Sequence, residues 1–122
     1  MCSTYANVPA RQSTCQATYN TSFTSDLHFG MGYYPVPGNV ADMQMEIMTN
    51  GSVEALMTLY TDFEQYKSGV YSHRSGSEVG TEAVRILGWG VDSNTPYWIV
   101  TIAYGPQWGN NGICWILRGN DE

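Results

Sequence analysis

Basic residues are scarce in this sequence. Lys67 is the one lysine, and lysine and arginine together number 5 against 11 acidic residues, which gives a formal net charge of -6 at pH 7. Nucleic-acid-binding proteins gather cations on one surface to neutralise phosphates, and here the four arginines are scattered along the chain. The composition therefore argues against a nucleic acid as partner.

Long apolar runs are also missing. No stretch approaches the roughly 18 consecutive apolar residues of a membrane-spanning helix, so we expect no membrane span. Met1 is followed at once by Cys2, Ser3 and Thr4, without the apolar core of a signal peptide. If the protein is exported, we expect this sequence to be a mature or truncated form.

Cysteine and histidine, the commonest metal ligands, are few. With 3 cysteines in the chain, at least one thiol has no partner within it. Cys2 and Cys15 lie in a polar, loop-like segment, and we expect one of them to form a disulfide, with the other or with a segment absent from this sequence. Cys114 lies in an apolar run and is expected to be buried. His28 and His73 are too far apart for a typical ligand pair, so we predict no metal site and no cofactor.

What the sequence does contain indicates one folded domain. Hydrophobic residues make up 43% and aromatic residues 13% of its 122 residues, enough for a core. Residues 1–25 are polar and without periodicity, which predicts an irregular loop segment, and residues 26–122 are expected to form a β-rich domain. Asn20 and Asn50 each begin an Asn-x-Ser sequence, a weak signal for glycosylation.

The second part of the chain predicts one helix followed by strands. Residues 39–50 form the helix, with Asn39 as its N-cap and with Val40, Met43 and Ile47, beside Met48, facing the core. A short edge strand is expected at Tyr33, Tyr34 and Val36, limited by the neighbouring prolines. Further strands are predicted at 53–60, 68–71, 83–89, 97–103 and 113–117, with a turn or short helix at 61–66, a polar loop at 72–80 and a hairpin turn at 92–96. This order indicates an α+β or mostly-β half-barrel.

The stretch from Gly80 to Gly90 is the most informative. It reads as a buried strand with one ionisable side chain, Glu82, at its entrance. Burying an unpaired charge is costly, so this carboxylate requires an explanation.

The motifs around this stretch carry a resemblance to a known family. They are Asp62-Phe63-x-x-Tyr66-Lys67-Ser68-Gly69-Val70-Tyr71-x-His73, Ala83-Val84-Arg85-Ile86-Leu87-Gly88-Trp89-Gly90, Thr95-Pro96-Tyr97-Trp98-Ile99-Val100, Trp108-Gly109-x-x-Gly112 and Ile116-Leu117-Arg118-Gly119. In this order and spacing they resemble the papain-like cysteine peptidases, most closely the cathepsin B-like members. The resemblance implies a papain-like fold, of which this chain would be the C-terminal, strand-rich half.

The resemblance also implies that the catalytic residues have been replaced. The family pattern Gly-Gly-His-Ala is Gly80-Thr81-Glu82-Ala83 here, so Glu82 stands at the catalytic His position. The family's Asn-Ser-Trp is residues 102–104, so Ile102 stands at the position of the orienting Asn. A carboxylate beside a thiol disfavours the thiolate, and isoleucine cannot hydrogen-bond to an imidazole ring. None of the three cysteines has the sequence context of the family nucleophile.

By the same alignment, four residues would line the former substrate groove: Thr81, Ala83, Tyr104 and Trp108. His73 matches a histidine outside the catalytic pair and is expected to be structural or on the surface. Cys2 resembles the cysteine that closes the occluding loop, with a partner upstream. Arg11 stands where the family has a further cysteine, so the resemblance gives no pairing for Cys15.

We therefore predict an inactive cathepsin B-like pseudopeptidase that binds peptides, propeptide-like segments or inhibitors. The expected partner is an N-terminal papain-like half or an oligomer, and the expected location is secreted or lysosome-like. Two alternatives remain open. The chain is either a fragment of an active cathepsin B-like cysteine endopeptidase, or a structural extracellular protein that has reused the fold.

Overall fold

The computed structural model describes residues 10–119. The chain forms two compact units, Met1–Tyr34 and Pro35–Glu122, each considered by itself. In the first, described residues 10–34 contain no helix or strand. Two turns organise this part: the backbone N–H of Tyr19 donates to the carbonyl of Gln16 (2.9 Å), and that of Ser25 donates to Ser22 (3.0 Å). The predicted division at residue 25 stays a prediction.

The edge strand predicted at Tyr33, Tyr34 and Val36 is wrong, because these described residues form no strand. Tyr33 is 99% exposed. Pro35 and Pro37 cannot donate to a ladder, and strand propensity alone does not hold an extended segment without a neighbour.

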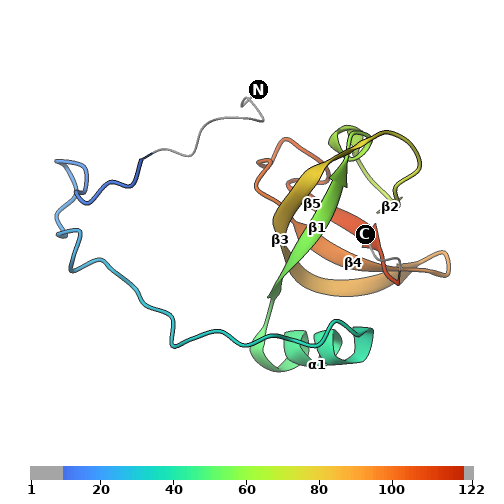
Figure 1. Ribbon diagram of the computed structural model, residues 1–122, viewed down its shortest axis with the longest axis horizontal. Coiled ribbons are helices and arrows are strands. Elements are labelled where there is room, and N and C mark those ends of the chain that lie inside the picture. Colours follow the sequence, from blue (N-terminus) through green and yellow to red (C-terminus); the bar gives the residue numbers. More distant parts are fainter. Residues whose placement is uncertain (1–9, 120–122) are drawn as a thin grey trace. The chain divides into compact units, whose positions relative to one another are not determined.

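The second unit contains one α-helix, a 3₁₀ turn and a five-stranded sheet (Figure 1). In chain order they are α1 (Val40–Asn50), β1 (Val53–Tyr60), η1 (Phe63–Gln65), β2 (Val70–Tyr71), β3 (Glu78–Asp92), β4 (Thr95–Thr101) and β5 (Ile113–Leu117). The sheet order is β1-β3-β4-β5-β2, with β2 parallel to β5 and the other pairs antiparallel. Within the described residues, no helix has the length and apolar character needed to cross a membrane.

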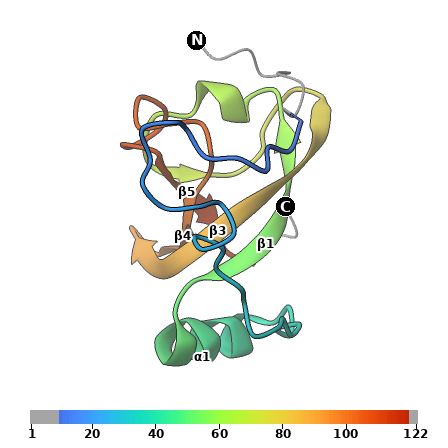
Figure 2. The ribbon, with the colours of Figure 1, turned by 90° about the vertical axis from the view of Figure 1, so that its left-hand side faces the viewer.

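Strand β3 is the longest strand, and it runs antiparallel between β1 and β4, with β1 beside it in Figure 2. It begins at Glu78, so the predicted loop at 72–80 is too long and the predicted strand at 83–89 too short. The prediction of a buried strand holds for one face only. Val84 and Ile86 are buried while Ala83, Arg85 and Leu87 are exposed, because the sheet covers a core on one face only.

The β3–β4 hairpin turns on two residues, Ser93 and Asn94, both with positive φ (49° and 67°). Such a pair matches the right-handed twist of the flanking strands, and asparagine tolerates this conformation well. The predicted turn at 92–96 is therefore in the right place but longer than the observed one.

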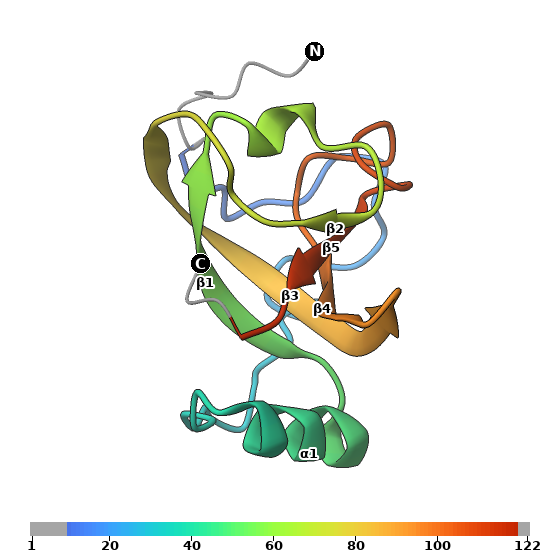
Figure 3. The same cartoon turned by 90° about the vertical axis from the view of Figure 1, so that its right-hand side faces the viewer.

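Helix α1 lies at one end of the sheet, next to the start of β1 (Figures 1 and 3). As predicted, Asn39 caps it: the side-chain Oδ1 accepts from the backbone N–H of Asp42 (3.0 Å). Met43 and Ile47 pack against the core, but Val40 is 38% and Met48 66% exposed. The apolar face of the helix is narrower than predicted, and Met48 does not belong to it.

A polar contact also fastens α1 to the sheet. With the Gln44 amide oxygen facing inward, it accepts from the indole Nε1 of Trp89 (3.0 Å) and from Nη1 of Arg118 (2.6 Å). The Arg118 guanidinium lies over the Trp98 ring, 5.4 Å from its centroid. One amide thereby joins the helix to β3 and to the residue that follows β5.

The core lies on the inner face of this sheet. Its centre is apolar and aromatic, and Phe63, Val100 and Cys114 are 1%, 2% and 0% exposed. Phe63 contacts the Tyr71 ring edge to face, with centroids 4.8 Å apart. One helix and a strand-rich sheet agree with the predicted α+β fold class.

Candidate functional site

Glu82 lies early in β3, directly opposite Met57 of β1. It shares a face of the strand with the buried residues Val84 and Ile86, and its own side chain is half-buried. Among the described residues, none forms a hydrogen bond or an ion pair with its carboxylate. Arg85, the nearest cation in sequence, points to the other face and donates through Nε to Ser52 Oγ (2.7 Å).

Ile102 follows the end of β4 and is 7% exposed. It belongs to the same core cluster as Met57 and Val100. Its carbonyl accepts from the backbone N–H of Tyr104 (2.9 Å), which closes a tight turn. The side chain is therefore part of the packed interior and offers no polar atom to a neighbour.

Two of the predicted groove residues contact each other. The rings of Tyr104 and Trp108 meet edge to face with centroids 5.1 Å apart. Trp108 also donates from its indole Nε1 to the carbonyl of Glu64 in η1 (3.2 Å). These contacts fix the loop between β4 and β5 against the aromatic core.

The other groove residues lie on the exposed face of β3. Ala83 and Ile102 line one open hollow of about 550 Å³, and Thr81 lies on the same face of β3 as Ala83 but outside this lining. Glu54 and Arg85, opposite each other in the β1–β3 register, also line the hollow. The structure thus brings Ala83 and Ile102 together in one hollow and Tyr104 and Trp108 in an aromatic pair, and Thr81 and Glu82 belong to neither group.

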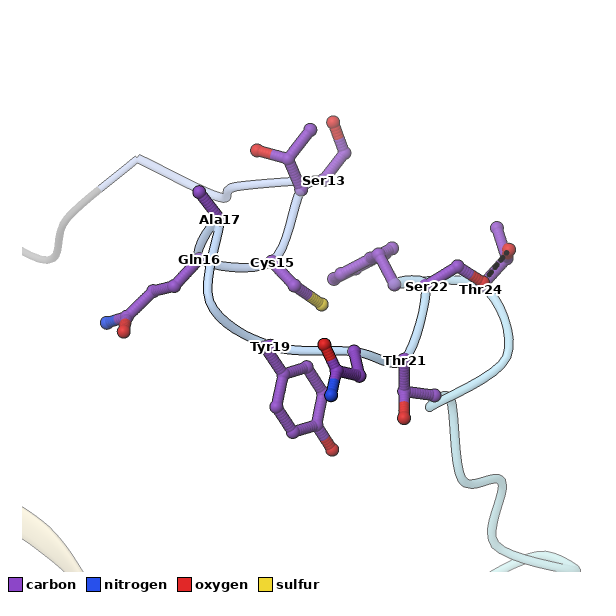
Figure 4. A pocket seen from close by; sticks show the side chains of 11 residues that line it. Ser13, Cys15, Gln16, Ala17, Tyr19, Thr21, Ser22 and Thr24 are labelled. Atoms are coloured by element: carbon purple, nitrogen blue, oxygen red, sulfur yellow. Dashed lines mark hydrogen bonds between the residues drawn. The ribbon is translucent and has the colours of Figure 1, made fainter.

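A second hollow lies in the first unit, along residues 13–24 (Figure 4). Its volume is about 560 Å³, it is open to solvent, and most of its lining residues are Ser, Thr, Asn or Gln. Cys15 points into it as a free thiol. Cys2 lies outside the described residues, so the predicted disulfide of Cys2 or Cys15 is not tested.

Cys114 is buried as predicted and is 0% exposed. Burial raises the pKa of its thiol to about 12. The sulfur lies 3.7 Å from the Val100 carbonyl, to which it donates. This thiol is structural, because a group that is neither ionised nor accessible cannot attack a substrate.

The structure reveals a polar centre around Asp62 that no sequence pattern indicated. The Asp62 carboxylate accepts from the Tyr71 hydroxyl (2.8 Å) and from the backbone N–H groups of Arg74 (3.0 Å) and Ser75 (3.2 Å). His73 Nδ1 is 3.1 Å from the same carboxylate. These hydrogen bonds, led by the one from Arg74, hold the pKa of Asp62 well below its usual range.

His73 therefore contributes to the structure of this polar centre. Its ring stacks on Tyr60 with centroids 3.6 Å apart. Because Asp62 and its donors are 9 to 13 residues apart in the chain, spacing alone could not have paired them. No group of three or more potential metal ligands occurs in the part of the chain that the structure describes.

Comparison with known proteins identifies the family of this chain. The model of the papain family cysteine proteases matches residues 2–122, nearly the whole chain. The chain belongs to the papain family. The resemblance inferred from the motifs is thereby confirmed.

Individual relatives narrow the match to the cathepsin B-like members. The chain is 47% identical to cathepsin B-like cysteine proteinase 4 of Caenorhabditis elegans, over 95% of this chain and 35% of that protein. It is 44% identical to a gut-specific cysteine proteinase of the same nematode, over 96% of this chain and 36% of that protein. A cathepsin B-like cysteine proteinase of Schistosoma japonicum is 44% identical, over 93% of this chain and 33% of that protein.

Solved structures give the same fold. Procathepsin B S9 of Trypanosoma congolense superposes with a TM-score of 0.65 and 44% identity, covering 67% of this chain and 28% of that one. The bromelain protease of Ananas comosus superposes with a TM-score of 0.59 and 31% identity, covering 71% and 40%. This papain-family chain spans about a third of the length of the curated relatives it matches.

Proposed function

We propose that this chain is the strand-rich half of a cathepsin B-like pseudopeptidase, which binds peptides, propeptide-like segments or inhibitors without cleaving them. The observation that carries the proposal is the pair Glu82 and Ile102, at the expected positions of the catalytic His and its orienting Asn. Ile102 packs in the core, which supports the proposal that this position no longer serves to orient a catalytic imidazole.

The chemistry of the two side chains supports loss of catalysis. A cysteine peptidase needs an imidazole that activates the thiol and then protonates the leaving amine. A second polar group must hold that imidazole in the correct orientation. Glu82 supplies a carboxylate in place of the ring, and Ile102 supplies no hydrogen bond. Removing a member of such a unit costs several orders of magnitude in rate.

Cys114 does not compensate for these losses. Its thiol is 0% exposed and has a pKa raised to about 12. At acidic or neutral pH almost none of it is the nucleophilic thiolate. A nucleophile for the ordinary papain mechanism would have to come from a partner half.

The surfaces that remain suit an extended peptide. Tyr104 and Trp108 form an edge-to-face aromatic pair. The hollow beside Ala83 and Ile102 combines apolar walls with the charged residues Glu54 and Arg85. Apolar walls with a few polar groups are typical of ligand sites. The chain spans about a third of its relatives, so we propose that an N-terminal half or an oligomer partner provides the opposite wall.

We further propose a secreted or lysosome-like location and a disulfide that includes Cys2 or Cys15. A disulfide requires an oxidising compartment. The free thiol of Cys15 is then available to a partner cysteine outside the described residues.

The competing function is that of an active cysteine endopeptidase of which this chain is one part. The identity of 44% to 47% to proteinases supports it. Under this alternative, another side chain would replace the imidazole.

One assay separates the two functions. The complete gene product is incubated with a fluorogenic dipeptide substrate at acidic pH, beside an active cathepsin B-like proteinase as positive control. We expect no turnover of the substrate. We also expect a labelled peptide to bind, as measured by fluorescence anisotropy, and this binding to persist after the protein's thiols have been alkylated. Turnover that a thiol-alkylating inhibitor abolishes would reject the pseudopeptidase.

A further inference from the structure

The chain has two Asn-x-Ser sequences, and the structure distinguishes between them. Oligosaccharyl transferases recognise this sequence, and the attached glycan requires an exposed asparagine in the folded protein. Both Asn20 and Asn50 are exposed. The two asparagines differ in the hydrogen bonds and neighbouring residues that an attached sugar would disturb.

Asn50 is engaged in the fold. It is the last residue of α1, and its Nδ2 donates to Glu46 Oε1 (2.9 Å). Ser52, whose hydroxyl completes the recognition sequence, accepts from Arg85 Nε (2.7 Å) and lines the 550 Å³ hollow. A glycan here would disturb the end of the helix and stand beside the proposed binding surface.

Asn20 carries no such role. It lies between the turn that ends at Tyr19 and the turn that begins at Ser22. Among the described residues, none forms a hydrogen bond with its side-chain amide. The hydroxyl of Tyr19 donates to Asp26 Oδ1 (3.0 Å), which closes a small loop around Asn20 without involving it. Asn20 also lines the open hollow along residues 13–24, and a sugar on its amide would break no side-chain hydrogen bond there.

The segment that follows gives the modification a use. Phe29, Met31 and Tyr33 are 83%, 106% and 99% exposed. Exposed apolar side chains in succession promote aggregation unless they are covered. A hydrophilic glycan on Asn20, which precedes these residues by 9 to 13 positions, would increase the solubility of this part of the chain.

We infer that Asn20 carries an N-linked glycan and that Asn50 does not. In the transfer, the Asn20 amide nitrogen bonds to C1 of a lipid-linked oligosaccharide. The C1–oxygen bond to the lipid pyrophosphate breaks, and one amide proton leaves with the pyrophosphate. The inference rests on the proposed passage through the secretory pathway, which the experiment tests separately.

The chain is expressed in eukaryotic cells behind a heterologous secretion signal, and its intact mass is measured before and after treatment with a glycan-releasing amidase. We expect one glycan, and amidase release converts Asn20 to Asp. Asn20→Gln and Ser22→Ala abolish the mass shift, whereas Ser22→Thr and Asn50→Gln retain it. The Asn20→Gln protein should also be secreted in lower yield and with more aggregate.

Each other outcome has one meaning. An unmodified wild-type chain, or a glycan that persists in Asn20→Gln and disappears in Asn50→Gln, overturns the inference. In a parallel arm the complete native coding sequence is expressed without an added signal. Modification in the first arm and none in the second would leave the Asn20 site standing and reject the proposed location.

Discussion

A substitution at Ile102 tests whether the residue at the expected position of the catalytic Asn now serves as a core residue. It stands at the expected Asn position, yet it is 7% exposed and packs in the core. We expect Ile102→Asn to lower the free energy of unfolding by about 2–4 kcal/mol, because it removes apolar contacts and buries an amide. Urea denaturation followed by tryptophan fluorescence measures the change.

The matched control is Ile102→Val, which removes one methylene and should cost about 1 kcal/mol. If the Asn variant were as stable as the wild type, the interior at this point would have to be open to water or to hold a polar partner. The interpretation of Ile102 as a core residue would then be wrong.

Asp62 predicts a specific dependence of stability on pH. Its pKa in the folded state lies below the ordinary 3.8, so as the pH falls the unfolded chain takes up the proton first. The stabilisation is therefore complete above about pH 3.8 and decreases as the pH falls below that value. We expect Asp62→Asn to unfold at lower urea concentration than the wild type at pH 7, with a smaller difference at pH 3.

Glu64→Gln is the control for Asp62, since the Glu64 side chain is exposed and two residues away. It should change the urea midpoint little at either pH. An Asp62→Asn variant that keeps the wild-type midpoint at pH 7 would show that the hydrogen bonds to Asp62 contribute nothing net.

At the scale of elements, helix α1 is held by its N-cap as well as by the packing of Met43 and Ile47. Asn39 supplies the capping oxygen to Asp42, and none of the helix residues is fully buried. We expect Asn39→Ala to lower the free energy of unfolding by about 1 kcal/mol and to reduce the helical circular dichroism signal. Asn39→Ser keeps a capping oxygen and should retain most of the stability and most of the helical signal. An equal loss of stability in the Ala and Ser variants would contradict the capping role.

The helix and strands also show which structural features neighbouring residues in the sequence can predict. The helix cap, the Ser93–Asn94 turn and strand β1 follow from neighbouring residues, and all three were predicted close to their observed positions. The Tyr33 to Val36 strand failed because a strand needs a neighbour to pair with. The length of β3 was missed because residues 78–82 are polar, and their pairing with β1 decides their conformation.

At the scale of the whole molecule, the chain exposes apolar surface on its sheet. Leu56, opposite Ala83 in the β1–β3 register, is 73% exposed. We expect the isolated chain to self-associate, because the surface proposed to meet a partner half would face water. Size-exclusion chromatography with light scattering measures this.

Leu56→Ser should reduce the self-association, whereas Val91→Ser, which removes a 63% exposed side chain near the hairpin, should leave it unchanged. A wild-type chain that stays monomeric at high concentration would remove the argument for a missing half. Equal effects of the two substitutions would instead indicate association without a defined surface.

The sequence by itself determined the family and the papain-like fold, and it predicts that Glu82 and Ile102 replace two catalytic residues. These follow from motifs whose order and spacing are read directly along the chain. Tertiary structure alone decided that Ile102 belongs to the core, that Asp62 gathers Tyr71, His73 and two backbone N–H groups, and that β3 is buried on one face only. The physical reason is that burial and hydrogen bonding are set by residues brought together from distant parts of the chain, whose pairing no local pattern specifies.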